Sequence, residues 1–482
     1  MFSISDYINT TWVWWSATVI YAVVILSTVV VVVSENRNPV KSLAWVTVLL
    51  VVPGLGLILY LIFGRNIQSK RIISRRNRRR LRRLQGKPSK SDFSRLRLSH
   101  DNLQLAQLAY NLCMTPYTEG NYAEVFDNGT DKFNALLRDI ADARSYINIE
   151  YYIIDDDRTG TAVARALEER ARAGVTVRLI YDHVGSFKAP NRFFRAMREA
   201  GVDAKPFFKV VFPFLGTRIN WRNHRKICVI DGRIGYIGGM NIADRYVNGG
   251  KMFKTWRDLH LRIEGPAVGQ LQQAFAVDWN FMGNPLPEQP TDFSKARVPH
   301  PMGMQFISGG PVSRWMNLTL IFQKAISNAK KCVYLQTPYF LPSEGLLHAL
   351  QMCALARVDV RLMLPRRSDS DMLRWASFSY ISECLRAGIK VYLYDEGMLH
   401  SKAIIIDDDI ATVGSCNFDF RSFEHNFEAN MLIYSREFNA RMKQIFLRDQ
   451  AQSVRVLPAT WRRRPIIERG MESFMRLFAP IL

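Results

Sequence analysis

Two stretches of the sequence carry the same chemically active residue types in the same order. They read NHRKICVIDGRIGYIGGMN at 223–241 and LHSKAIIIDDDIATVGSCN at 399–417, and both fit H-x-K-x4-D-x6-G-[GS]-x-N. The first copy contains His224, Lys226, Asp231, Gly238, Gly239 and Asn241, and the second contains His400, Lys402, Asp407, Gly414, Ser415 and Asn417. Because average residue usage matches a fixed position only about once in twenty, two copies in register indicate a duplicated functional element.

Three kinds of chemistry could use these side chains, and two of them fit poorly. A metal site needs several lone-pair donors, whereas a lysine ammonium has none and repels a cation. A nucleophile-elbow hydrolase needs G-x-S-x-G, which the sequence does not contain. A phosphate site fits, because Lys226 and Lys402 supply point charges and the two histidines can divide nucleophile and acid roles. Further hydrogen-bond donors for phosphate are Asn241, Asn417 and Ser415.

The spacing of the motif also predicts its local geometry. KICVI and KAIII are β-branched runs, and each is followed by a turn and a return strand. Because side chains alternate along a strand, the histidine and the lysine of each copy lie on one face. We include Asp231 and Asp407 among the catalytic residues of the motif. Both end a strand, however, so we expect them to hold the turn rather than to touch substrate.

The two motifs belong to a longer internal repeat. IADARSYINIEYYII at 140–154 resembles ISNAKKCVYLQTPYF at 326–340, and GVTVRLIYD at 174–182 resembles RVDVRLMLP at 357–365. Apolar strands alternate with helical stretches, which is typical of an α/β fold. Duplicated halves can pack about a pseudo-two-fold axis and bring equivalent loops to one seam. Buried, satisfied polar pairs at that seam are the alternative, but they leave the duplication unexplained.

Two uncharged stretches near the N-terminus predict a transmembrane hairpin within residues 1–66. Residues 12–33 and 43–63 contain no charged side chain, and each is about as long as a helix that crosses a bilayer. The alternatives are a signal peptide and a buried helix. No Lys or Arg precedes the first stretch, and a second span follows at once, so cleavage is not expected. Basic residues after the second span place both termini in the cytoplasm.

The positive charge of the chain is concentrated after these spans, in an expected linker at 67–104. The net charge is +22, and residues 65–97 hold 14 Lys or Arg against one acid, Asp92. The region Arg75–Arg83 could contact anionic lipid headgroups or nucleic acid. Its position directly after a span favours lipid.

A C-terminal segment, residues 456–482, has an amphipathic pattern. Ile467, Met471, Phe474 and Phe478 recur at helical spacing after the basic start WRRRP. Such a helix could lie on a membrane surface. The alternative is a terminal helix that packs on the core.

The cysteines show no pattern of a disulfide framework or a metal site. They lack a CxxC pair, and two lie inside the repeated motif. We therefore expect buried thiols in a reducing compartment. The six are Cys113, Cys228, Cys332, Cys353, Cys384 and Cys416.

The doubled motif resembles that of the phospholipase D superfamily. The fragments NPVKSLAWVTVLLVVPGLGLILYLIFGRN, IEYYI, QTPYFLPSEGLLHAL and SFEHNFEANM resemble bacterial cardiolipin synthases in particular. The resemblance covers nearly the whole chain. It implies two phospholipase D-like repeats, at 105–296 and 297–455, with mixed sheets flanked by helices and an active site at the seam. The triple acid at 407–409 departs from the usual turn of the family.

The resemblance also implies a mechanism and site residues. One histidine forms a covalent phosphatidyl-histidine while the other protonates the leaving glycerol oxygen. We take His224 as the nucleophile and His400 as the acid. The lysines and asparagines hold the phosphoryl oxygens, so no metal or other cofactor is required. An acid downstream of each motif orients a histidine, and Asp258 and Glu428 match those positions.

The expected enzyme is a phosphatidyltransferase that converts two phosphatidylglycerol molecules into cardiolipin and glycerol. The resemblance places it in a bacterial inner membrane as a multi-pass protein with a cytoplasmic catalytic domain. A phospholipase D hydrolase, or a transferase with another acceptor, is the alternative within the superfamily. A membrane-tethered nuclease would use the Arg-rich run, but we expect no nucleic-acid partner. The oligomeric state is left open.

Overall fold

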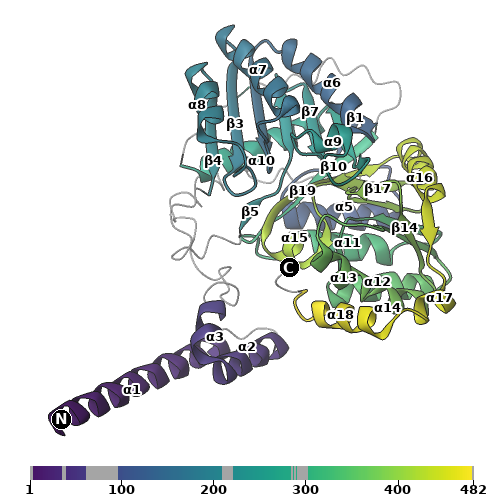
Figure 1. The fold of residues 1–482 in the computed structure, drawn as a ribbon. Coiled ribbons are helices and arrows are strands. Elements are labelled where there is room, and N and C mark those ends of the chain that lie inside the picture. Colours follow the sequence, from purple (N-terminus) through teal and green to yellow (C-terminus); the bar gives the residue numbers. More distant parts are fainter. Residues whose placement is uncertain are drawn as a thin grey trace. The chain divides into compact units, whose positions relative to one another are not determined.

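The structure of the chain, a computed structural model, contains two units that are described separately (Figure 1). The described residues are 4–34, 39–60, 96–208, 221–283, 286, 289 and 302–479. One unit contains the helices up to residue 60, and the other contains the remaining described chain. The expected lipid-contacting region Arg75–Arg83 lies outside the described residues, as does most of the linker 67–104.

The N-terminal unit begins with one long apolar helix, α1 (Ile4–Ser34). Within the described residues, only its segment Thr11–Ser34 is both long and apolar enough to cross a membrane. Most of its apolar side chains are exposed, including Trp12, Trp14 and Trp15. The first expected span, residues 12–33, therefore lies in one continuous helix.

The second expected span, residues 43–63, is not one continuous helix in its described part. Helix α2 (Pro39–Val51) ends shortly before Pro53, where α3 (Pro53–Leu59) begins. Proline has no backbone N–H, and its ring clashes with the carbonyl four residues earlier, so the helix breaks there. The described residues thus contain one helix of membrane-crossing length, and the two-span hairpin stays a prediction.

The second unit is an α/β fold of two halves with matching strand orders. The first half has the order β1-β9-β7-β6-β2-β3-β4, and the second has β10-β19-β17-β16-β11-β13-β14-β20. The strands of the first half are β1 (Thr118–Phe126), β2 (Tyr146–Tyr151), β3 (Thr176–Asp182), β4 (Asp203–Phe207), β6 (Ile227–Ile230), β7 (Ile234–Gly238) and β9 (His260–Glu264). Those of the second are β10 (Met302–Gly309), β11 (Cys332–Gln336), β13 (Asp359–Pro365), β14 (Lys390–Tyr394), β16 (Ala403–Ile406), β17 (Ile410–Gly414), β19 (Asn426–Tyr434) and β20 (Ser453–Arg455). The sequence repeat is therefore a structural repeat.

Both sheets are mixed, and one antiparallel pair joins them. Strands β2, β3 and β4 are parallel, whereas β6, β7 and β9 pair antiparallel. The second half repeats this pattern, and β1 pairs antiparallel with β10 at the join. An antiparallel pair of equivalent strands is what a two-fold axis between the halves produces. The expected α/β fold with mixed sheets is confirmed.

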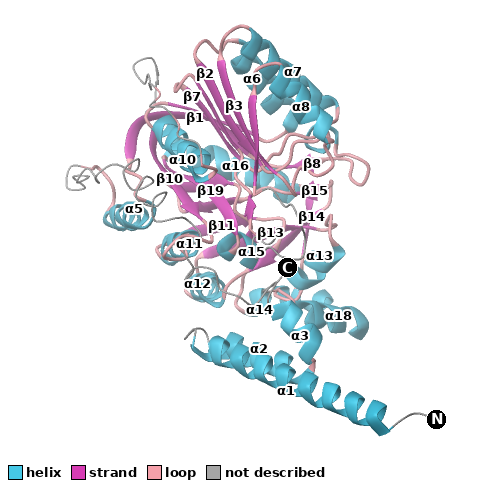
Figure 2. Cartoon of the chain, turned by 90° about the vertical axis from the view of Figure 1, so that its left-hand side faces the viewer, coloured by secondary structure: helices cyan, strands magenta, loops and turns pink. Residues whose placement is uncertain are grey.

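Helices cover the sheets and provide the crossovers that parallel strands need (Figure 2). The first half has α6 (Gly129–Ala141), α7 (Arg158–Arg172), α8 (Asn191–Glu199), α9 (Arg245–Asn248) and α10 (Ala267–Phe281). The second has α11 (Asn317–Ser327), α12 (Glu344–Leu355), α13 (Asp371–Phe378), α14 (Ile381–Arg386), α15 (Phe420–Glu424), α16 (Arg436–Ala451), α17 (Pro458–Arg462) and α18 (Ile466–Arg476). Short strands β12 (Phe340–Leu341) and β18 (Phe418–Asp419) also pair in this half.

Three large apolar clusters form the core of this unit. One fills the first half around Leu136 of α6, and another fills the second half around Leu350 of α12. The third lies at the join, where Leu271 of α10 and Phe446 of α16 pack with strands of both sheets. All six cysteines are free thiols, and five of them are buried, as expected. The halves therefore share one of the three clusters, in addition to the one that each half has of its own.

Helix α5 (His100–Cys113) precedes the first half in sequence but packs on the second. Its Leu105 and Ala109 are buried in the cluster of the second half. The Asn102 side chain donates a hydrogen bond to Asp409 Oδ2 at 2.7 Å. The expected boundary after residue 104 therefore falls inside a helix that is tied to the second repeat.

The turns that follow the motif strands are held by their aspartates. Asp231 and Asp407 adopt left-handed φ angles of 52° and 49°. The Asp231 carboxylate accepts hydrogen bonds from the backbone N–H groups of residues 144–146, at 2.8–2.9 Å. Asp407 does the same with residues 330–332, at 2.7–3.1 Å. Despite the triple acid, the second turn keeps the anchoring of the first.

Replacing either anchor should destabilise the fold more than it impairs chemistry. We expect Asp231→Ala or Asp407→Ala to lower the free energy of unfolding by about 1–3 kcal/mol, because three backbone donors lose a charged acceptor. Thermal unfolding of the purified protein measures this effect. Asp408→Ala is the matched control, since Asp408 only pairs with the partly exposed Lys331 and Lys443. An unchanged melting temperature with abolished turnover would show instead that the anchors act in catalysis.

Candidate active site

Each motif histidine follows a short strand that pairs with the opposite half of the fold. Strand β5 (Arg222–Asn223) pairs parallel with β19, and the His224 N–H donates to the Phe427 carbonyl at 3.0 Å. Strand β15 (Met398–Leu399) pairs parallel with β8 (Trp256–Arg257), and the His400 N–H donates to the Arg257 carbonyl at 2.6 Å. The backbone of each histidine is thus fixed by the opposite half.

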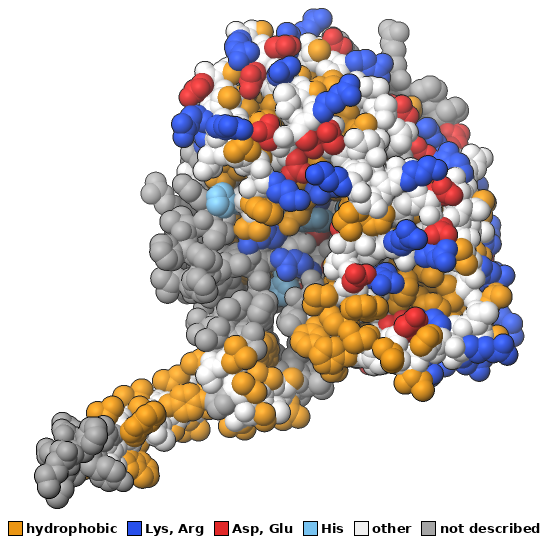
Figure 3. Space-filling view, in the orientation of Figure 1, with side chains coloured by type: hydrophobic (Ala, Val, Ile, Leu, Met, Phe, Trp, Pro, Cys, Tyr) orange, Lys and Arg blue, Asp and Glu red, His pale blue; other side chains and the backbone are white. Residues whose placement is uncertain are grey.

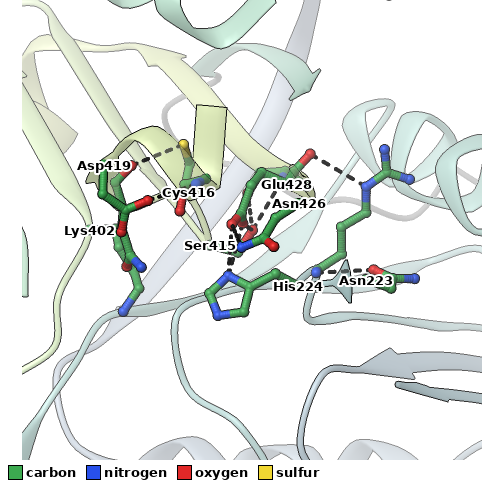
Figure 4. A network of polar contacts seen from close by, with 12 residues as sticks. Asn223, His224, Lys402, Ser415, Cys416, Asp419, Asn426 and Glu428 are labelled. Atoms are coloured by element: carbon green, nitrogen blue, oxygen red, sulfur yellow. Dashed lines mark hydrogen bonds and ion pairs between the residues drawn. The ribbon is translucent and has the colours of Figure 1, made fainter. Parts of the chain in front are cut away.

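The His224 imidazole is held by Glu428 of the second half (Figure 4). Its Nδ1 lies 2.8 Å from Glu428 Oε1, and both side chains are buried. Because a carboxylate only accepts hydrogen bonds, Nδ1 carries the proton and Nε2 keeps its lone pair. The Ser415 hydroxyl and the Asn426 amide also donate to this carboxylate. Burial alone would raise the Glu428 pKa, but His224, Lys226 and Ser415 lower it overall.

The His400 imidazole, whose Nδ1 also lies 2.6 Å from Lys402 Nζ, is held by Asp258 of the first half. Its Nδ1 lies 2.6 Å from Asp258 Oδ2, and the Leu259 backbone N–H donates to the other carboxylate oxygen at 2.8 Å. A Cβ on Gly239 would lie 2.2 Å from Asp258 Oδ1, so only glycine fits there. Ser415 occupies the position of Gly239 in the second motif, where its side chain fits beside Glu428 and donates a hydrogen bond to it. This difference explains why the motif has Gly in one copy and Ser in the other.

The two motif lysines are buried beside their histidines. Lys226 Nζ donates to the His224 carbonyl at 2.6 Å, and Lys402 Nζ donates to the His400 carbonyl. Lys402 Nζ also lies 3.7 Å from Asp258 Oδ2. Burial lowers the pKa of Lys226 to about 7 and also lowers the pKa of Lys402. Phosphate oxygens would offset this desolvation by supplying the missing negative charge.

Both imidazoles are neutral at neutral pH because they are buried. Burial, with the adjacent lysine adding to it, lowers the pKa of His224 and of His400 to about 4, although the paired carboxylate acts in the opposite direction. A neutral imidazole can attack phosphorus through Nε2. An anionic phosphodiester beside the rings raises their pKa, so the bound substrate favours protonation of the second histidine.

The other three expected phosphate ligands, Asn241, Asn417 and Ser415, differ in how far the protein already uses their polar atoms. The Asn241 amide donates to the Tyr246 hydroxyl at 2.5 Å and accepts from the Ile153 N–H at 3.2 Å. Asn417 Oδ1 is buried and has no hydrogen-bond partner among the described residues. The Ser415 hydroxyl is already used on Glu428. The Asn417 side chain also hydrogen-bonds to the Asp419 carboxylate, so its Oδ1 is the polar atom of these three residues that is left without a partner.

Aromatic rings that the motif pattern does not reveal border both histidines. The Tyr152 ring packs edge-on against His224 with centroids 4.8 Å apart. Trp256 and Tyr246 lie 5.5 and 6.0 Å from the His400 ring. Tyr152 lies inside the family-like fragment IEYYI and Trp256 lies two residues before Asp258, so the sequence held a signal for these two rings but none for Tyr246. No three metal-ligating side chains come together within the described part of the chain.

The second unit, called the catalytic unit below because it contains both motifs, matches the family described as cardiolipin synthase, PLD-like domain, over residues 136–279 and 322–450. Residues 17–65 match the family described as phospholipase D-nuclease N-terminal. The chain is 38% identical to the major cardiolipin synthase ClsA of Bacillus subtilis (strain 168), with 95% of this chain and 97% of that protein covered. The chain belongs to the cardiolipin synthase family.

Other relatives agree with this membership. A cardiolipin synthase of Geobacillus kaustophilus (strain HTA426) is 38% identical, covering 93% of this chain and 90% of that protein. The crystal structure of phosphatidylserine synthase from Haemophilus influenzae Rd KW20 has a TM-score of 0.59 at 14% identity, covering 78% of this chain and 98% of that one. This likeness concerns the fold. The expected resemblance to cardiolipin synthases, and the expected phospholipid-transferring enzyme, are confirmed.

Loss of a histidine-orienting carboxylate should slow chemistry in a protein that still folds, because the amide keeps the shape of the acid. We expect Asp258→Asn or Glu428→Gln to lower kcat by roughly 100-fold, because the amide no longer fixes the Nδ1–H tautomer or stabilises an imidazolium. KM for lipid should change little. Steady-state kinetics measure both constants, with Asp203→Asn in the surface pair with Lys205 as a control. Wild-type kcat in both variants would show that the carboxylates do not orient the histidines.

The buried histidines also predict a pH dependence of stability. An unfolded histidine titrates near 6.5, whereas the folded pKa of His224 and His400 is about 4. Unfolding between these pH values takes up protons, so the free energy of unfolding falls as the pH falls. Each histidine contributes a slope of up to about 1.4 kcal/mol per pH unit.

Denaturant unfolding at several pH values tests this dependence. His400→Gln should flatten the slope below pH 6.5, whereas His348→Gln, which changes an exposed ring, should not. Equal slopes in wild type and His400→Gln would contradict a buried neutral imidazole.

Proposed function

We propose that the chain transfers a phosphatidyl group from one phosphatidylglycerol to the terminal hydroxyl of another and releases glycerol. The supporting observation is the pair of buried histidines, each hydrogen-bonded through Nδ1 to a carboxylate of the opposite half. This arrangement leaves two Nε2 atoms for chemistry. Two lysines beside them supply positive charge for a phosphate.

In the first step, Nε2 of one histidine attacks the phosphorus of the donor lipid. The bond from phosphorus to the glycerol headgroup oxygen breaks, and the other histidine, protonated at Nε2, gives its proton to that oxygen. Glycerol leaves, and the phosphatidyl group stays on nitrogen. We assign the nucleophile to His224 and the acid to His400.

In the second step, the hydroxyl of another phosphatidylglycerol attacks the same phosphorus. Its proton passes to the histidine that was left neutral, and the phosphorus–nitrogen bond breaks to give cardiolipin. Splitting one displacement into two lets the imidazoles exchange roles without external acid or base. Lys226, Lys402, Asn241 and Asn417 would hold the phosphoryl oxygens, while Ser415 supports Glu428.

We further propose that the enzyme acts at the cytoplasmic face of a bacterial inner membrane. The apolar α1 supports membrane anchoring, and α2 with α3 would form the second arm of the hairpin despite the break at Pro53. Proline is tolerated in a membrane span when neighbouring helices satisfy the freed backbone groups. The repeats at 105–296 and 297–455 would be the catalytic domain, and the basic linker would recruit anionic lipid.

Turnover by purified protein in phosphatidylglycerol liposomes tests the proposal. Cardiolipin and glycerol should form in equal amounts, and His224→Ala or His400→Ala should abolish both. Mass spectrometry of the enzyme quenched in denaturant at mildly alkaline pH, where a phosphorus–histidine bond survives, should show a phosphatidyl adduct on His224. Phosphatidic acid as the only product would identify water as the acceptor and the enzyme as a phospholipase.

A further inference from the structure

Helix α18 is fixed to the catalytic unit along one side. Its Met475 is buried in the core cluster of the second half. Arg476 donates to Glu383 of α14 at 2.5 Å, and its guanidinium stacks 4.2 Å from the Tyr380 ring. Glu472 is buried and pairs with Arg464. The helix is therefore a rigid part of the fold with a defined orientation.

The opposite side of this helix is apolar and exposed. Ile466, Ile467, Leu477 and Phe474 are 82%, 81%, 76% and 54% exposed. At 3.6 residues per turn these four side chains, with Gly470 between them, form one stripe of about a quarter of the circumference. The stripe differs from the expected one, because Met471 and Phe478 turn partly toward the core. A contiguous apolar face of this kind on a folded protein indicates a partner.

Basic residues accompany this stripe. Arg462 and Arg463 at the end of α17, and Arg469 on α18, are exposed, against one exposed acid, Glu468, on that helix. Figure 3 shows apolar side chains gathered over α18 on the same face as the hollow that contains histidines and basic residues. Exposed apolar residues flanked by arginines match an anionic lipid surface, where rings and alkyl chains enter the acyl boundary and guanidiniums meet phosphates.

We propose that α18 docks on an anionic bilayer, with Ile466, Ile467, Phe474 and Leu477 inserted at the headgroup–acyl boundary. Docking holds the catalytic unit at the surface that contains its lipid substrates, in addition to any anchoring by α1. A second copy of the chain is the other partner that could cover such a stripe. It lacks the lipid's negative charge for the arginines, so the bilayer fits better.

Site-specific fluorescence in proteoliposomes tests this docking with the full chain. A single cysteine replaces Ile467 or Phe474 in a Cys113→Ser background, in which the remaining native thiols are buried. The cysteine is labelled with an environment-sensitive dye in vesicles of phosphatidylglycerol and phosphatidylcholine. We expect blue-shifted emission and quenching by spin-labelled lipid acyl chains. Glu468→Cys, exposed but off the stripe, should show little of either.

Activity provides a second readout that separates docking from the proposed function. In liposomes, Ile466→Ser combined with Ile467→Ser should lower turnover by roughly threefold or more, because an interfacial helix loses apolar area. In detergent micelles, where lipid reaches the pocket without a bilayer, turnover should match wild type. If wild-type protein formed no cardiolipin, the proposed function would be wrong, but the fluorescence result on docking would still hold.

Several outcomes would overturn the docking proposal. Dyes at 467 and 474 that are quenched no more than the dye at 468 would place the stripe in water. Protection of the stripe that depends on protein concentration, with crosslinking between copies through residue 467, would assign it to a protein interface. Loss of micelle activity in the double variant would indicate a structural role.

Discussion

Each candidate catalytic imidazole is held by a carboxylate from the other half of the fold. The rest of the structure depends on these two hydrogen bonds between the halves. Glu428 and Asp258 are fully buried, and a buried carboxylate is costly unless it is paired and hydrogen-bonded. Separation of the halves would leave both acids and both histidines without these partners. The contacts that assemble the site are therefore also contacts that make the two halves one unit.

Several kinds of contact fix the two halves to each other at the join. Strands β1 and β10 are paired, α10 and α16 share one apolar cluster, and short strands on either side fix the backbone next to each histidine. The two sites are similar but not identical. Gly239 leaves room for the shorter Asp258, while Ser415 adds a hydrogen bond to the longer Glu428. The duplicated motif thus has two different environments, which agrees with the two roles proposed for the histidines.

Much of the fold and site could be predicted from the sequence, because the repeat and the motif are governed by local rules. The position of Asp231 at a strand end predicts its role in the turn. The expected alternation of His and Lys along one strand is wrong in detail, because both residues of each motif precede strands β6 and β16. The carboxylates that hold the histidines, Asp258 and Glu428, were predicted from the family resemblance and could not be predicted from the spacing of the motif. The use of Ser415 on Glu428 depends on side-chain packing between distant strands, which no local pattern reveals.

Other differences arise from tertiary context. Helix α5 packs on the second half because its apolar face fits α11, although it precedes the first half in sequence. Pro53 divides an apolar stretch that hydropathy alone treats as continuous. In α18, the hydrophobic pattern predicts an amphipathic helix. Only the packing of this helix on the rest of the fold shows which of its apolar residues are covered and which are exposed.

A structure of the protein with vanadate bound would test the central claim most directly, since vanadate mimics phosphorus during in-line displacement. We predict one vanadium in the pocket, with Nε2 of one histidine bonded to it and Nε2 of the other next to the opposite apical oxygen. Both Nδ1 atoms should remain on Glu428 and Asp258. Imidazoles that face separate cavities, or a vanadate bound by one histidine while the other keeps no contact with it, would contradict the account.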